Sequence, residues 1–187
     1  MPTALEVLAE EASACTKCKL ATAGRTQVVF GMGNPDADLM FVGEGPGAEE
    51  DKQGLPFVGR SGQLLDKVLF EELGMKRDQV YINNVVMCRP PGNRDPEPDE
   101  IESCSPYLEQ RIALIEPKVV VTLGNFATKL LLNTKDGITK VRGRTYPFRT
   151  GVLIPTFHPA AVLRGGGEPM AQMRADFIRA KKALEAA

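Results

Sequence analysis

The chain contains the run Asp38-Leu39-Met40-Phe41-Val42-Gly43-Glu44-Gly45-Pro46-Gly47, in which apolar residues lead into a glycine-rich turn. A short apolar segment that stops at such a turn is typical of a buried strand in a parallel sheet. Residues 62–73 then carry apolar side chains at helical spacing, which predicts a helix packed against that strand. A strand, a turn and a helix in this order indicate an α/β fold.

The alternation of strands and helices continues along the chain. Further strands are predicted at 79–87, 118–123 and 152–156. Further helices are predicted at 5–12, 99–115 (with Asp99 as the cap), 125–132 and 170–185. This order predicts a three-layer α/β/α sandwich with a central, mostly parallel four-stranded sheet. Residues 1–187 have the length of a single domain, to which the N-terminal helix is expected to belong.

Three features are expected to meet at one edge of this sheet, because ligands of open α/β sheets bind beyond the carboxyl ends of the strands. The glycine-rich turn follows the first strand, Asn84 lies near the end of the second, and His158, the only histidine, follows the fourth. Glycines let backbone N–H groups approach a flat ligand, and an amide offers a donor and an acceptor to a nucleobase edge. Of the neighbours Asn83 and Asn84, one should face the core side or the pocket and the other should not.

The chain has four cysteines. Cys15 and Cys18 form a C-x2-C hook, whereas Cys88 and Cys104 are separated by fifteen residues. Four thiolates can complete a tetrahedral site for zinc or hold an iron–sulfur cluster, and the spacing alone leaves the metal open. Two disulfides or four unrelated core thiols are the alternatives. Disulfides are disfavoured because the first twenty residues contain three glutamates and no apolar run suited to export, so a reducing intracellular compartment is expected.

The charge is nearly balanced, with a net charge of −1 and a pI near 6.0. No apolar stretch approaches the ~20 residues of a membrane helix, so no membrane association is expected. A polyanionic partner would need a local basic patch. Residues 137–167 contain no acid and carry the basic residues Lys140, Arg142, Arg144, Arg149 and Arg164. This segment is either a surface that follows phosphates or a solvated face without a partner.

Several motifs in a fixed order resemble the family 4 uracil-DNA glycosylases, the branch that carries a [4Fe–4S] cluster. The likeness runs from Cys15 to about Arg164. It is carried by Cys15-Thr16-Lys17-Cys18, Gly24-Arg25-Thr26, Val28-Val29-Phe30-Gly31, Gly33-Asn34-Pro35-Asp36-Ala37, Val42–Gly47, Gly54-Leu55-Pro56-Phe57-Val58-Gly59, Asn84–Pro91, Ile138–Gly143 and Phe157–Arg164.

The resemblance implies the uracil-glycosylase sandwich, a [4Fe–4S] cluster and a function in DNA repair. The cluster ligands would be all four cysteines: Cys15, Cys18, Cys88 and Cys104. The reaction would be hydrolysis of the N-glycosidic bond of deoxyuridine in single- or double-stranded DNA, which releases uracil and leaves an abasic site. The protein is expected to act as a cytoplasmic, nucleoid-associated monomer.

The resemblance also implies roles for individual residues. Phe57 would stack on uracil, Asn84 would bind its polar edge, and His158 would donate toward O2, assisted by backbone N–H groups of Gly43, Glu44 and Gly45. The best-known uracil glycosylases have a water-positioning Asp where this chain has Gly45. The remaining candidates for that role are the polar residues Glu44, Glu50 and Asn93. The expected DNA contacts are Leu163, as a wedge, and the basic residues Arg142, Arg144 and Arg164.

The sequence leaves three alternatives open. A neighbouring family of covalent uracil-DNA binders carries a Gln in the first motif and a basic insertion after the second strand, but here Gly45 is present and no insertion follows Cys88. A non-catalytic DNA-binding module with a structural metal is the second alternative. The third is a dinucleotide oxidoreductase, because residues 43–48 match G-x-G-x-x-A. The acidic residues 49–51 argue against it, since they would face a pyrophosphate.

Overall fold

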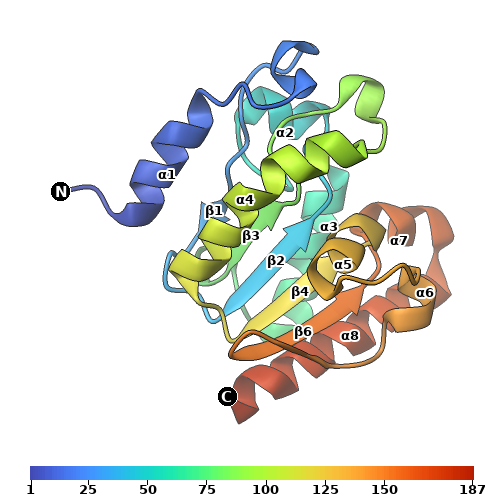
Figure 1. Cartoon of the computed structure of the whole chain (residues 1–187). Helices are drawn as coiled ribbons and strands as arrows, with labels where there is room; N and C mark the ends of the chain where they lie inside the picture. Colours follow the sequence, from blue (N-terminus) through green and yellow to red (C-terminus); the bar gives the residue numbers. More distant parts are fainter.

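The computed structural model describes residues 1–187, and strands alternate with helices along the chain as predicted (Figure 1). The strands are β1 (Met32–Gly33), β2 (Leu39–Gly43), β3 (Tyr81–Asn84), β4 (Val119–Leu123), β5 (Tyr146–Phe148) and β6 (Gly151–Thr156). The α-helices are α1 (Ala4–Ser13), α2 (Ala48–Gln53), α3 (Arg60–Val68), α4 (Pro98–Ile115), α5 (Asn125–Leu132), α6 (Ile138–Val141), α7 (Pro159–Gly165) and α8 (Gly167–Ala186). Short helical turns are η1 (Lys19–Thr22), η2 (Leu69–Leu73), η3 (Arg77–Gln79) and η4 (Pro91–Asn93).

The strands form one six-stranded sheet in the order β1-β3-β2-β4-β6-β5. Its four central strands, β3, β2, β4 and β6, are parallel and correspond to the four predicted strands. The edge strands β1 and β5 pair antiparallel and were not predicted. They are two and three residues long, too short for an apolar alternation, and β5 contains Pro147, which is tolerated only at a sheet edge.

Helices cover both faces of the sheet, which confirms the three-layer sandwich. Because side chains alternate along a strand, Met40 and Val42 of β2 pack in one core and Leu39 and Phe41 in the other. The first core is closed by α1, α4 and α5, and the second by α3, α7 and α8. Figure 1 shows α4 and α5 in front of the sheet, with α3 and α8 behind it.

Three element boundaries differ from the prediction. Helix α4 is capped by Glu97 rather than Asp99, because Pro98 starts the helix and the Glu100 carboxylate accepts the Glu97 N–H at 2.8 Å. The helix predicted at 62–73 changes after Val68 into a π-helical turn, η2. The strand predicted at 79–87 is shortened to β3, since the N–H groups beyond it bond to the glycine-rich turn instead of continuing the ladder.

None of the helices combines the length and the apolarity that crossing a lipid bilayer requires.

Candidate active site and cysteine cavity

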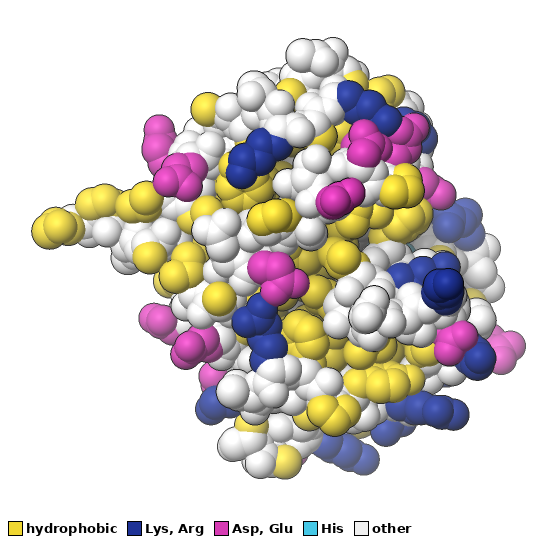
Figure 2. Space-filling view, in the orientation of Figure 1, with side chains coloured by type: hydrophobic (Ala, Val, Ile, Leu, Met, Phe, Trp, Pro, Cys, Tyr) yellow, Lys and Arg dark blue, Asp and Glu magenta, His cyan; other side chains and the backbone are white.

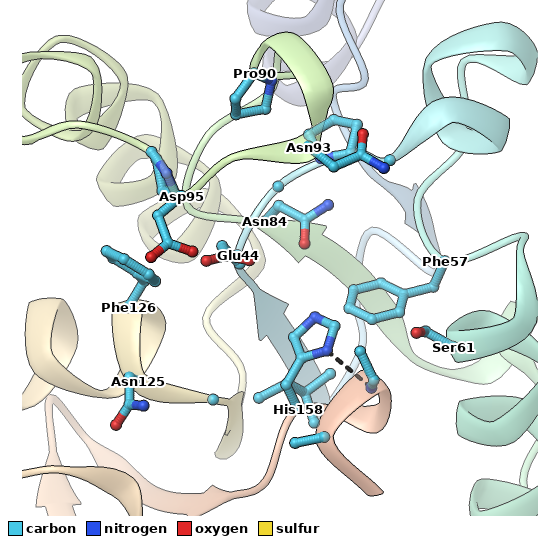
Figure 3. A pocket seen from close by; sticks show the side chains of 18 of the residues that line it. Glu44, Phe57, Ser61, Asn84, Pro90, Asn93, Asp95, Asn125, Phe126 and His158 are labelled. Carbon is cyan, nitrogen blue, oxygen red and sulfur yellow. Dashed lines mark hydrogen bonds between the residues drawn. The ribbon is translucent and has the colours of Figure 1, made fainter. Parts of the chain in front are cut away.

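A cavity of about 570 Å³ lies beyond the carboxyl ends of the parallel strands (Figure 3). Residues 44–47 of the glycine-rich turn, Asn84, Phe57 and His158 line it, as do Pro90 and residues 93–96, whereas Gly43 lies beneath the lining. The glycine-rich turn, Asn84 and His158 therefore meet at one edge of the sheet, as the order of the strands predicted. Glu44, Gly45, Glu50, Asn93 and Arg164 also line the cavity.

Gly43, the last residue of β2, allows the floor of the cavity to form. A Cβ atom on Gly43 would lie 2.4 Å from Cζ of Phe57 and 2.5 Å from Oδ1 of Asn84. Real Cβ atoms do not approach other atoms so closely, so any side chain here would push the ring or the amide away. Glycine at this position is thus explained by packing across the cavity floor.

Phe57 contributes an aromatic ring from an unusual backbone conformation. Its φ is +53°, in the left-handed region that costs a bulky residue on the order of 1–3 kcal/mol. The ring is 5% exposed, and its centroid lies 5.6 Å from that of the His158 ring at an interplanar angle of 32°. Surrounding contacts must therefore hold this conformation.

His158 is a neutral hydrogen-bond donor. Its Nδ1 accepts the backbone N–H of Ala160 at 3.1 Å, so the proton of the neutral ring is on Nε2. Burial, reinforced by the charge of Arg164, lowers the pKa of His158 to about 4, although Glu50 opposes the shift. Figure 3 shows the imidazole below the Asn84 amide and beside the Phe57 ring. At neutral pH the site thus presents an uncharged N–H rather than an imidazolium.

Asn84 presents an unsatisfied amide to the cavity. Its side chain is 2% exposed, and Oδ1 has no hydrogen-bond partner. Asn83 does not line the cavity, and its Nδ2 donates to the carbonyl of Phe41 at 2.8 Å. Asn84 alone of the two lines the cavity, but Asn83 is fully buried as well, so the expectation that one amide faces neither the core nor the pocket is wrong, because helices cover both faces of the sheet. A buried acceptor without a partner fits a ligand that brings its own N–H.

Glu44 and Asp95 form a carboxyl pair in the cavity (Figure 3). Burial raises the pKa of Glu44 to about 7, and the charge of the neighbouring Asp95 adds to the shift. Asp95 was not predicted as a site residue, because in the sequence it reads as a solvated acid in a loop rich in proline. Its position after a strand that ends at the cavity was the only available signal.

Glu50 and Asn93 line the cavity, but both side chains are engaged elsewhere. Glu50 Oε1 accepts the Gly47 N–H at 3.1 Å, and Oε2 accepts the N–H groups of Val58 and Gly59 at 2.9 and 2.7 Å. Glu50 therefore connects the glycine-rich turn to the loop that carries Phe57. Its position at the start of α2 also occupies the place where a dinucleotide pyrophosphate would bind.

Asn93 lies at the exposed side of the cavity, and its Oδ1 accepts a hydrogen bond from Nε of Arg89 at 2.7 Å. Of the three candidates for positioning water, Glu50 is bound to backbone N–H groups and Asn93 to an arginine. Only the Glu44 side chain has neither kind of contact.

Two of the expected DNA contacts lie together at the cavity mouth. Arg164 lines the cavity and is exposed, and its neighbour Leu163 on α7 is 43% exposed. Arg144 is exposed and forms no ion pair. These three side chains are free to meet a ligand.

Arg142 is placed differently from the prediction. Its guanidinium binds the fully buried Asp176 through two hydrogen bonds, of 2.9 and 2.8 Å. Arg149, in the turn between β5 and β6, lies at the opposite end of β6 from His158 and pairs with Glu109. The basic residues of segment 137–167 therefore do not form one continuous surface. On the face of the molecule drawn in Figure 2, basic and acidic side chains are interspersed.

The four cysteines line a second, small cavity, and none of them forms a disulfide. The structure therefore favours neither two disulfides nor four thiols that lie apart from one another. No three His, Cys, Asp or Glu side chains converge closely enough to hold a single metal ion. The four cysteines therefore share one cavity without forming a compact site for a single ion.

Two arginines stand beside the cysteines. Arg25 donates to Sγ of Cys88 at 3.1 Å and to the carbonyl of Cys15 at 2.8 Å. Arg111, on the same helix as Cys104, is fully buried, forms no ion pair and leaves one nitrogen without a partner. A buried guanidinium without a counter-charge is costly. Four thiolates around a cluster would supply negative charge to both arginines.

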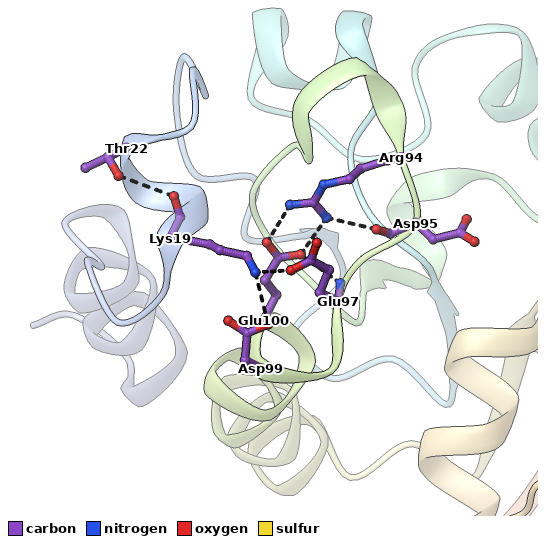
Figure 4. A network of polar contacts seen from close by, with 7 residues as sticks. All are labelled: Lys19, Thr22, Arg94, Asp95, Glu97, Asp99 and Glu100. Carbon is purple, nitrogen blue, oxygen red and sulfur yellow. Dashed lines mark hydrogen bonds and ion pairs between the residues drawn. The ribbon is translucent and has the colours of Figure 1, made fainter.

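A network of ion pairs connects the two cavities (Figure 4). Arg94 lines the large cavity and Glu100 the cysteine cavity. They are joined by two hydrogen bonds of 2.8 Å, which hold the pKa of the Glu100 carboxyl below its usual value. Lys19, beside the cysteine hook, pairs with Glu97 and with Asp99 at 3.4 Å. The N-terminal hook is thus tied to the loop that borders the large cavity.

The chain belongs to the uracil DNA glycosylase superfamily, because the model of that family matches residues 30–184. It is 52% identical to the type-4 uracil-DNA glycosylase of Sulfurisphaera tokodaii over 167 residues, which cover 85% of this chain and 76% of the relative. It is 45% identical to the type-4 enzyme of Thermotoga maritima over 182 residues, covering 96% and 94% of the two chains. The type-5 uracil-DNA glycosylase of Thermus thermophilus is 31% identical over 180 residues, 80% of each chain. The family resemblance of the motifs is confirmed.

Proposed function

We propose that this protein is a DNA-repair enzyme that hydrolyses the N-glycosidic bond of deoxyuridine in DNA, releasing uracil and leaving an abasic site. The observation that carries the proposal is the convergence of the unpaired Asn84 amide, the Phe57 ring and the neutral His158 N–H in one cavity. The names of the relatives, type-4 uracil-DNA glycosylases at 45 and 52% identity, support the same reaction.

The substrate base must leave the DNA stack, because its glycosidic bond is out of reach inside a duplex. The extruded uracil would stack on Phe57. Its N3–H would donate to the unpaired Oδ1 of Asn84, whose Nδ2 would donate to O4. Arg164, Arg144 and Leu163 are free to hold the flanking backbone and the vacated stack.

Bond cleavage develops negative charge on uracil O2 and positive charge on the sugar. His158 would donate its Nε2–H to O2 and keep the proton, while uracil departs with the bonding electron pair as an anion. Backbone N–H groups of residues 43–45 would assist. A neutral donor suits this role because burial already disfavours an imidazolium at this position.

Water then adds its oxygen to C1′ of the sugar, and its proton must be accepted. Glu44 is the proposed acceptor, since a carboxyl group with a pKa of about 7 can take up a proton at neutral pH. Asp95 would tune Glu44 through its negative charge. We assign Glu50 and Asn93 to positioning, because their side chains already bind the backbone N–H groups and Arg89 described above.

The four cysteines are proposed to hold a [4Fe–4S] cluster, which would supply a cross-link between the N-terminal hook, the segment after β3 and α4. Because residues 15 and 18 complete a site whose other half is at residues 88 and 104, we infer that residues 1–187 act as one domain. An intracellular location and a monomeric state complete the proposal. A reducing compartment would keep the four thiols available for iron.

The proposal is tested with a uracil-containing oligonucleotide and purified, cluster-loaded protein. The parent is expected to convert the uracil site to an alkali-labile abasic site, and both His158→Ala and Asn84→Ala to do so far more slowly. A strand that stays resistant to alkali overturns the proposal. A denaturation-resistant protein–DNA adduct would instead indicate a covalent uracil-DNA binder, and DNA retention without abasic product a binding module. Saturable NADH binding would indicate an oxidoreductase.

A further inference from the structure

We propose that Arg77, which does not line the cavity, is a positioning residue that holds Phe57 in its strained conformation against the substrate base. The proposal rests on the function proposed above and adds to it a residue that acts only through Phe57.

Phe57 cannot hold its conformation by itself. Its φ of +53° is one that bulky side chains rarely adopt, and Phe57 has it although Gly54 and Gly59 stand nearby in the same loop. The ring must remain opposite Gly43, where a Cβ would lie 2.4 Å from it. A backbone that relaxed to negative φ would turn the ring away from this floor.

Arg77 binds the carbonyl side of the loop. One guanidinium nitrogen, Nη1, donates to the carbonyl of Pro56 at 2.9 Å, and Nη2 donates to the carbonyl of Phe57. The third nitrogen, Nε, is fixed by Asp66 of α3 at 2.6 Å. The planar guanidinium thus bridges two successive carbonyls, which a lysine ammonium cannot match in geometry.

Two further contacts confine the same loop from other directions. Glu50 accepts the N–H groups of Val58 and Gly59, directly after Phe57. On α3, a Cβ at Gly62 would lie 1.7 Å from the Phe57 carbonyl oxygen, so glycine is needed for the loop to approach the helix. Replacing Glu50 would change the cavity lining, and replacing Gly62 would disturb the contact between the loop and α3. Arg77 can be replaced without either effect.

Loss of the Phe57 stack should affect substrate binding more than bond cleavage. Stacking on Phe57 would stabilise bound uracil in the ground state and in the transition state alike, so its loss should raise KM more than it lowers kcat. The His158 donor and the Glu44–Asp95 pair do not contact Arg77 and should keep their roles. A variant with a released Phe57 is therefore expected to be a binding-defective enzyme with its chemistry largely retained.

The test is a double-mutant cycle on uracil-containing DNA. Arg77→Met and Arg77→Lys are each made in the parent and in Phe57→Ala. The matched control is Arg174→Met, which removes a nearby arginine that pairs with Glu71 and Glu72 of η2 without contacting the Phe57 loop. Thermal unfolding midpoints are measured for all variants.

Arg77→Met is expected to raise KM on the order of 10-fold with a smaller change in kcat, as the loss of a base–aromatic stack would. Arg77→Lys should fall between it and the parent, and Arg174→Met should match the parent. In the Phe57→Ala background Arg77→Met should change KM by less than ~2-fold, since the ring through which it acts is gone. If Arg77→Met does not fold, the comparison is made with Arg77→Lys, which keeps the charge beside Asp66.

If Arg77→Met raises KM equally in the parent and in Phe57→Ala, the inference is overturned. It is also overturned if the parent is active and Arg77→Met has the same KM as the parent. A parent that releases no uracil is a different result. It overturns the proposed function, and the positioning role of Arg77 with it.

Discussion

The backbone N–H of Ala160 donates to Nδ1 of His158 at 3.1 Å, and this one hydrogen bond fixes which nitrogen of the imidazole faces the substrate. His158 is the N-cap of α7, and Pro159 occupies the first helical position. The His-Pro sequence therefore starts a helix and at the same time selects the Nε2–H tautomer. A local capping interaction thus sets the chemistry proposed for the site.

Replacing His158 by alanine should lower kcat by about 10²–10³-fold, the usual cost of one donor to a developing anion, with little change in KM. Because burial lowers its pKa to about 4, His158 stays neutral between pH 5 and 8. The kcat of the parent should show no inflection from this residue near pH 6.5. Single-turnover rates over pH 5–8 check both points, and an inflection near pH 6.5 that disappears in His158→Ala would contradict them.

The Glu44–Asp95 pair predicts a rise in kcat with pH centred near 7. Glu44 has a pKa of about 7 and must be ionised to accept a proton from water. Asp95→Asn removes a neighbouring negative charge, so the pKa of Glu44 should fall and the inflection should move to lower pH. It should stay above 4.5, because burial is the larger cause of the shift. An inflection that stays in place or moves upward in Asp95→Asn would count against the pair.

Glu44→Gln should lower the activity and raise the stability at alkaline pH. The folded-state pKa of Glu44 is raised, so the folded protein binds more protons than the unfolded chain between about pH 4.5 and 7, and stability falls as pH rises through that window. Glutamine removes this penalty. The thermal midpoint of Glu44→Gln should exceed that of the parent at pH 8, by about 2–4 °C for each ~1 kcal/mol, and match it near pH 4. If Glu44→Gln is less stable than the parent at pH 8, ionised Glu44 does not destabilise the fold and its pKa is not raised.

The sequence was sufficient for the parallel core of the fold because each central strand is a short apolar run, as in β4. Strands β1 and β5 were not predictable, since their residues carry no alternation and their pairing depends on the finished sheet. Asn84 and His158 were predictable as site residues because parallel strands end at one edge.

Residues whose roles depend on contacts distant in sequence were not predictable. Asp95 acts through Glu44, Arg77 through a loop twenty residues earlier, and Arg142 pairs with Asp176 on α8. Each of these side chains alone reads as a solvated charge. Only the folded chain shows which charge is buried and with which partner.

The cysteine cavity predicts four iron atoms per chain in protein purified without oxygen. Cys88→Ser and Cys104→Ser should each lose most of the iron and lower the thermal midpoint, because the cross-link between the N-terminal hook and the rest of the chain would be lost. Iron and zinc are quantified on the same samples. One zinc per chain in the parent, or full iron content in both serine variants, would contradict a four-cysteine cluster.

Arg164 and Arg142 should separate DNA binding from stability, although the sequence treats them alike. Arg164 is exposed at the cavity mouth, so Arg164→Gln should weaken DNA binding, reduce the slope of log Kd against log salt by about 1 and leave the thermal midpoint unchanged. Arg142→Gln should leave that slope unchanged and destabilise the fold by about 3–5 kcal/mol, since it strands the fully buried Asp176. The hydrogen bond from Thr156 to Asp176 should keep the loss near the lower figure. Salt titrations of DNA binding and thermal unfolding of both variants are the measurements. If Arg142→Gln lowers the salt slope instead, Arg142 leaves Asp176 when DNA binds, and the buried pair is a resting state rather than a structural element.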